Sequence, residues 1–60
     1  MTTEQAITML SARYGQITTV KDGVFAARDG DNFELFRLID GRLERRFDPD
    51  EHTCVWEVVG

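Results

Sequence analysis

The sequence predicts an α+β domain in which one N-terminal helix packs on an antiparallel meander sheet of four to five strands. Two observations lead to this prediction: an amphipathic segment near the N-terminus, and three Asp-Gly pairs that separate short apolar runs. Asp-Gly between apolar runs is a strong hairpin signal, because glycine adopts a positive φ without a Cβ clash and aspartate tolerates the left-handed region. Such turns join neighbouring strands directly, so most of the chain is expected to form one meander.

We expect the helix to span about residues 3–14. Thr2, followed three residues later by Gln5, fits a capping box at its start. Gly15 is suited to the left-handed position that closes a helix. One stripe repeats at helical spacing along the segment and is expected to be buried: Thr3, Ala6, Ile7, Leu10 and Tyr14.

We expect the strands at about 16–21, 24–28, 33–39, 42–47 and 53–59. A two-residue loop at the first Asp-Gly pair places Val20 opposite Phe25, and the next hairpin places Phe25 opposite Phe36. The last Asp-Gly pair places Arg37 opposite Glu44, and this charge-complementary pair supports the register.

Because side chains alternate across a strand, these pairings sort the residues into two faces. The face expected under the helix holds Val20, Phe25, Ala27, Phe36, Leu38, Leu43 and Phe47, with Glu34 and Arg45 towards one end. The long loop before the last strand leaves the parity of that strand open. Cys54, Trp56 and Val58 match this apolar face best, so we expect Trp56 to lie under the helix.

The opposite face mixes aliphatic and charged side chains. It is expected to hold Ile17, Thr19, Val24, Ala26, Phe33, Leu35, Ile39, Val55 and Val59, interleaved with Lys21, Arg28, Arg37, Arg42, Glu44, Arg46 and Glu57. No second helix is available to cover this face, so either the sheet curls on itself, with arginine stems covering the aliphatics, or another molecule docks.

Docking predicts a small, non-enzymatic protein-interaction module that binds another protein or a second copy of itself, with a homodimer as one outcome. The predicted partner-binding residues are Val24, Phe33, Leu35, Arg37, Ile39, Arg42 and Arg46. Pairing through the edge of the first or last strand is a second route to association. Accessory and inhibitory proteins of phages and mobile elements are often this small and acidic, which is an analogy of size alone.

The charge balance disfavours nucleic acid as a partner. The formal net charge is −4 and the pI is about 4.7, which opposes attraction to phosphate backbones. The alternative function is a single-stranded nucleic-acid platform on the arginine-rich face, where Phe33 would be the one aromatic residue available for base stacking.

The densest polar cluster is the segment 48–54, Asp-Pro-Asp-Glu-His-Thr-Cys. His52 and Cys54 are metal-capable, but a structural zinc site needs four ligands and no second Cys/His pair exists, so a solvated loop is expected and no metal or cofactor is predicted. No catalytic residue is predicted either.

The remaining features bear on compartment and size. A single cysteine cannot form an internal disulfide, which predicts a cytoplasmic protein. The first residues lack the pattern of a signal peptide, and no apolar run approaches a membrane span. A chain of 60 residues predicts one domain over residues 1–60.

Overall fold

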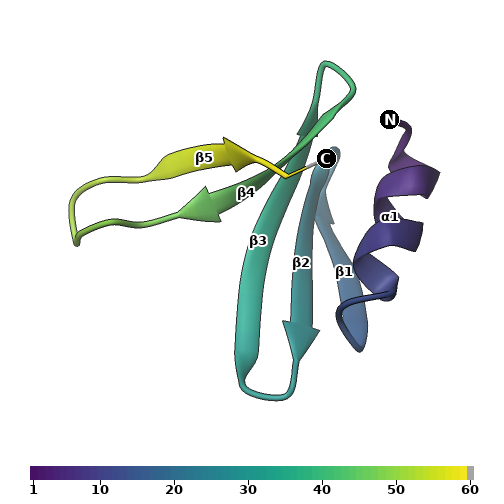
Figure 1. The fold of residues 1–60 in the computed structure, drawn as a ribbon, viewed down its shortest axis with the longest axis horizontal. Helices are drawn as coiled ribbons and strands as arrows, with labels where there is room; N and C mark the ends of the chain where they lie inside the picture. Colours follow the sequence, from purple (N-terminus) through teal and green to yellow (C-terminus); the bar gives the residue numbers. More distant parts are fainter. Residues whose placement is uncertain (60) are drawn as a thin grey trace.

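The computed structural model describes residues 1–59, so the last residue of the expected domain lies outside the described part. One helix packs on a five-stranded antiparallel sheet with the strand order β1-β2-β3-β4-β5, which confirms the predicted α+β fold (Figure 1). The elements are α1 (Thr3–Ser11), β1 (Gln16–Lys21), β2 (Val24–Asp29), β3 (Asn32–Ile39), β4 (Arg42–Phe47) and β5 (Val55–Val58).

The helix begins at the predicted capping box. The backbone N–H of Gln5 donates to the Thr2 hydroxyl at 3.1 Å, and the Gln5 side chain accepts from the Thr2 N–H at 2.9 Å. The helix ends at Ser11, three residues earlier than expected, in a tighter turn in which the Arg13 N–H donates to the Leu10 carbonyl at 3.0 Å. The same carbonyl also accepts the Tyr14 N–H at 2.9 Å. No left-handed glycine is needed to close this end.

The hydrophobic core lies between α1 and one face of the sheet, which we call the helix face. Its buried members are Ala6, Leu10, Phe25, Ala27, Phe36 and Leu43. Tyr14 extends this core, since its ring meets the Phe36 ring edge-on with centroids 5.7 Å apart. The core therefore joins the helix to the central strands.

The two inner hairpins have the predicted register. Phe25 pairs with Phe36 across β2 and β3, and Arg37 pairs with Glu44 across β3 and β4. Both residues of the Asp40-Gly41 turn have positive φ angles, 53° and 74°, as in a type I′ turn, so the strands continue without a slip.

The expected register of β1 is wrong because the strand contains a bulge. Thr19, not Val20, lies opposite Phe25, and Val20 becomes the extra residue with 56% of its surface exposed. In the turn that follows, only Gly23 has a positive φ, so this Asp-Gly pair does not form the two-residue turn of the β3–β4 hairpin. The bulge shifts the alternation and brings Ile17 to the core instead of the opposite face.

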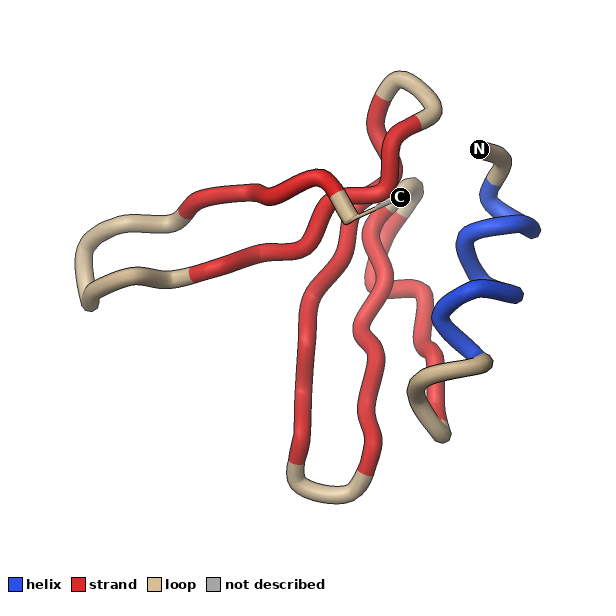
Figure 2. Tube along the Cα trace, viewed as in Figure 1, coloured by secondary structure: helices blue, strands red, loops and turns tan. Residues whose placement is uncertain are grey.

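The β4–β5 hairpin projects sideways from the other strands, and the loop that joins β4 to β5 lies at its far end (Figures 1 and 2). Trp56 pairs with Arg46 and Val58 pairs with Glu44. Both apolar side chains therefore lie on the face away from α1, and the expectation that Trp56 lies under the helix is wrong. Cys54, expected in the same buried set, precedes β5 and is exposed.

The helix does not reach this hairpin because it lies at the β1 side of the sheet, away from β4 and β5 (Figure 1). Within residues 1–59, no helix is long and apolar enough to cross a membrane.

We predict that Leu10→Ala lowers the free energy of unfolding by about 2–5 kcal/mol, because Leu10 is 1% exposed at the centre of the core. One core in a domain of this size supplies about 3–5 kcal/mol, so the variant should be largely unfolded. Urea titration followed by Trp56 fluorescence measures the loss. Thr8→Ala on the exposed side of the helix is the control, and an equal effect of both changes would contradict the assigned core.

Candidate functional site

The face of the sheet away from α1, which we call the far face, carries all seven residues that the sequence predicted as partner-binding. They fall into two groups. Phe33, Leu35 and Arg46 line one hollow, whereas Val24, Arg37, Ile39 and Arg42 lie towards the β3–β4 turn.

Phe33 is the most exposed aromatic side chain on the far face, with 63% of its surface accessible. It stands between two hollows. One, of about 410 Å³, lies over β1 and β2 and is lined by Thr18, Ala26 and Arg28 as well as Phe33. A bulky apolar ring beside concave surface on both sides is typical of a protein contact site.

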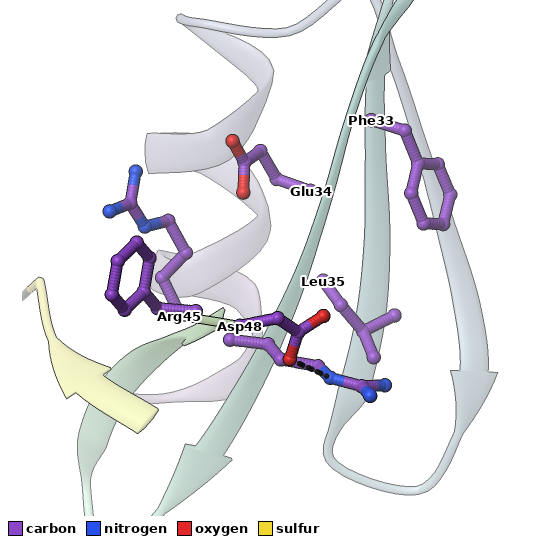
Figure 3. Close-up of a pocket in the computed structure, with 7 residues that line it drawn as sticks. Phe33, Glu34, Leu35, Arg45 and Asp48 are labelled. Atoms are coloured by element: carbon purple, nitrogen blue, oxygen red, sulfur yellow. Dashed lines mark hydrogen bonds and ion pairs between the residues drawn. The ribbon is translucent and has the colours of Figure 1, made fainter. Parts of the chain in front are cut away.

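The second hollow, of about 470 Å³, is a fork in the sheet (Figure 3). The β3–β4 ladder ends at the pair Phe36–Arg45, so the first half of β3 pairs only with β2, and the end of β4 pairs only with β5. Phe33 and Leu35 project to one side of β3, and Glu34 projects to the other. The fork therefore leaves apolar side chains and backbone groups of β3 open to solvent.

The opposite end of the far face is covered by the protein itself. Arg37 Nε donates to Glu44 Oε1 at 2.6 Å, and the Arg37 guanidinium lies 4.4 Å from the centre of the Trp56 ring. The Glu44 side chain is only 9% exposed beneath them. Arg37 is thus held in an ion pair and a cation–π contact, which favours a structural role for this residue.

The other arginines of β3 and β4 are also paired with carboxylates. Arg46 Nε donates to Asp48 at 3.2 Å, and this contact raises the pKa of Arg46 above its ordinary value. Arg42 lies 4.0 Å from Asp40. On the helix face Arg45 Nη2 donates to Glu57 at 3.3 Å, while the shielded Nε of Arg45 has no partner among the described residues, which nothing in the structure explains. The charges of the β3 and β4 arginines are therefore locally balanced, whereas Arg28 of β2, opposite Phe33, donates to the Gly30 carbonyl and has no ion pair among the described residues.

The segment 48–54 forms the solvent-exposed loop between β4 and β5. Asp50 organises it by accepting the His52 N–H at 2.8 Å and the Thr53 hydroxyl at 3.3 Å. These two hydrogen bonds stabilise the ionised form, with the His52 N–H as the larger cause, and lower the pKa of Asp50 below 3.8. In the described part of the chain, no three His, Cys, Asp or Glu side chains are grouped closely enough to hold a metal ion.

Comparisons of the chain with protein-family models, with curated proteins and with solved structures found no match.

The sequence-based prediction missed three contributors to the far face: Trp56, Val58 and Asp48. Glu57 lies opposite Arg45, and this charge pair accompanies the far-face position of Trp56 and Val58. Arg46 would satisfy Glu57 equally well in the other parity, so charge alone does not choose between the two. The position of Asp48 beyond the end of β4 has no sequence signal, because it depends on the conformation of the loop.

We predict that Arg37→Ala lowers the free energy of unfolding by about 1–3 kcal/mol, because Glu44 loses the partner of its buried carboxylate. The emission of Trp56, the only tryptophan, should shift to longer wavelength as its ring loses the guanidinium cover. Urea denaturation and fluorescence spectra measure both effects.

Two variants control this prediction. Arg42→Ala should change stability by less than about 0.5 kcal/mol, since its ion pair is long and exposed. Adding Glu44→Gln to Arg37→Ala should recover part of the loss by removing the unpaired charge. Equal effects of the Arg37 and Arg42 changes would contradict the structural role of Arg37.

We predict that the Asp50 carboxyl titrates below pH 3.8, and that the His52 amide proton titrates with it. Because the folded-state pKa is depressed, the contribution of Asp50 to stability is fully present above pH 3.8 and is lost as the pH falls through the folded-state value. NMR titration of the two nuclei gives the midpoint. Thr53→Val should move the midpoint upwards, and a midpoint at or above 3.8 in the unaltered protein would refute the hydrogen-bonded loop.

Proposed function

We propose that this protein is a small, non-enzymatic interaction module that binds another protein through the far face, with Phe33 and Leu35 at the centre of the contact. The observation that supports this most is the exposed Phe33 ring between two hollows, on a sheet face that no other element covers. Aromatic side chains in such positions are the common anchors of protein interfaces.

The contact surface proposed is smaller than the set of seven residues expected from the sequence. Phe33, Leu35 and Arg46 form its centre because they line the fork. Arg37 is engaged by Glu44 and Trp56, so its side chain supports the sheet and does not need to meet a partner. The partner expected on chemical grounds presents aliphatic or aromatic side chains and no excess of charge, since each arginine of β3 and β4 has its own carboxylate.

The same ion pairs weigh against binding of single-stranded nucleic acid through this face. A phosphate backbone would have to compete with the carboxylates of Asp48 and Glu44 for Arg46 and Arg37. Two exposed rings, Phe33 and Phe47, line the fork, but Phe33 lies on the far face and Phe47 on the helix face. Nucleic-acid platforms stack successive bases on several rings of one surface.

We predict that a photoreactive p-benzoylphenylalanine at position 33, introduced in the cells that produce the protein, crosslinks to one recurrent protein. The same group at position 8, on the exposed side of α1, should not yield that adduct. Adding Leu35→Glu to the position-33 probe should lower the adduct at least about tenfold, because a charge would be desolvated in the contact. Mass spectrometry identifies the adduct, and calorimetry with the purified partner measures the affinity.

Circular dichroism first checks that Leu35→Glu is folded, and Arg46→Glu, an exposed change at the same hollow, serves as the second change in the position-33 probe if it is not. An adduct that survives both changes, or forms equally from position 8, would remove the far face as the binding surface. Salt-sensitive binding of a fluorescent single-stranded oligonucleotide, weakened by Arg46→Ala, would replace the proposed function with the nucleic-acid alternative.

A further inference from the structure

The two edge strands of the sheet differ in how they are protected. β1 carries a bulge at Val20, ends in Lys21 and has the helix on its side of the sheet (Figure 1). Bulges, lysines and covering elements are the usual means by which proteins prevent an edge from pairing with another chain. β5, Val55–Val58, has no bulge in its register with β4 and contains neither proline nor lysine; its protection is limited to its short length of four residues and to Glu57, which is paired with Arg45.

The backbone groups on the outer edge of β5 can be assigned from the ladder. Val59 N–H donates to the Leu43 carbonyl at 2.8 Å, so alternate residues of this strand, Val55, Glu57 and Val59, direct their N–H and C=O groups towards β4. The N–H and C=O groups of Trp56 and Val58 therefore point outwards. Among the described residues, none of these outward groups has a backbone hydrogen bond outside the sheet ladder.

The β4–β5 hairpin also lacks support on its sides. Phe47 and Val55 are exposed on the helix face, beyond the reach of α1, and Val58 is 59% exposed on the far face. β3 pairs only with residues 42–45 of β4, so the far part of the hairpin, where Arg46 pairs with Trp56 and Phe47 with Val55, has two strands alone. Two strands alone are marginally stable in water, whereas three or more with an apolar face are stable. Two further strands along the free edge would supply what this hairpin lacks.

We infer that β5 pairs with β5 of a second copy of this chain, in antiparallel orientation about a two-fold axis, and that the pair forms one continuous sheet through both copies. The occupant is a second copy because the apolar side chains of β5, Val55, Trp56 and Val58, would then lie beside the same apolar side chains across the two-fold axis, and Arg45 neutralises Glu57, the one charge on the strand. This inference does not depend on the proposed function, because the far-face residues Phe33 and Leu35 take no part in it.

The register between the two β5 strands follows from the side chains that would face one another across the axis. Outward residues must pair with outward residues, so the two-fold axis passes at Trp56, at Glu57 or at Val58. An axis at Glu57 places two carboxylates directly opposite one another, which is unfavourable. An axis at Val58 places two valines opposite one another, whereas an axis at Trp56 places two indole rings opposite one another, and aromatic cross-strand pairs are among the more stabilising. An axis at Trp56 pairs residues 54–58 of each copy, with Trp56 facing Trp56 of the second copy and Val55 facing Glu57.

A contact of five residue pairs is small beside the roughly 800 Å² that each partner buries in a standard interface, so the dimer forms with rising concentration rather than permanently. Analytical ultracentrifugation from about 10 µM to about 1 mM tests this, and the mass should rise from 6.9 kDa to twice that value. Over the same range, hydrogen exchange of the Trp56 and Val58 amides should slow at least about tenfold, while the Val20 amide is unchanged.

Val58→Pro and Val58→Lys should each keep the protein monomeric at a concentration of about 1 mM. The Val58 N–H points away from β4, so proline removes no bond of the β4–β5 ladder, and lysine serves as the second variant if proline unfolds the strand. Val20→Lys, on the other edge strand, is the matched control and should dimerise like the unaltered protein. Leu35→Glu should also dimerise, which separates this inference from the proposed function.

The inference is overturned if the unaltered protein remains monomeric at the highest concentration, or if Val58→Lys dimerises as tightly as the unaltered protein. It is also overturned if Leu35→Glu abolishes the dimer while Val58→Lys does not, since the copies would then meet through the far face.

Discussion

The area that one short helix can cover constrains the rest of this structure. A helix of nine residues is about 14 Å long and about 10–12 Å wide, whereas five strands spaced about 4.8 Å apart span about 19 Å. The helix can therefore shield the middle and one side of a single face, where Leu10 meets Phe25 and Phe36. Everything beyond that footprint, which includes the β4–β5 hairpin and the whole far face, must be protected by other means or remain exposed. The solvent-accessible area of 4303 Å² exceeds the roughly 4,000 Å² typical of a monomer of this mass, which agrees with incomplete coverage.

At the turn end of the far face, side chains replace the missing second layer. Arg37 lies over Trp56 and bonds Glu44, so three residues from three adjacent strands close this end without a helix. The aliphatic stem of the arginine and the indole ring exclude water, while the ion pair satisfies the buried carboxylate. Internal cover by an arginine stem, one of the two alternatives raised by the sequence, thus applies to one end of the far face, and the end that holds Phe33 and Leu35 is open.

The sequence predicted the fold and the two inner hairpins because turn chemistry and cross-strand charge agree there. It did not predict the parity of the outer strands, for reasons that lie in particular residues. An Asp-Gly pair is compatible with positive φ at both positions, as at Asp40, or at glycine alone, as at Gly23, and the second choice accompanies the bulge at Val20. For β5, adjacent arginines before the loop offer Glu57 a partner in either parity, and only the contact of Trp56 with Arg37 distinguishes them. The positions of the β3 residues on the far face were therefore predicted from the sequence, and those of the β5 residues were not.

The far face and the β5 edge are separate surfaces, and their geometry links them. When identical strands pair antiparallel about a two-fold axis perpendicular to the sheet, equivalent faces lie on the same side of the combined sheet. A dimer through β5 would therefore present both Phe33 surfaces on one side, while the helices lie on the other. The two Phe33 surfaces of such a dimer would form one bivalent surface, and its avidity for a repeated or dimeric partner would exceed the affinity of either surface alone. Any partner that binds only the folded chain also stabilises it by mass action, which matters for a domain whose core is this small. Apolar surface that weakens the isolated monomer is then the same surface through which association restores its stability.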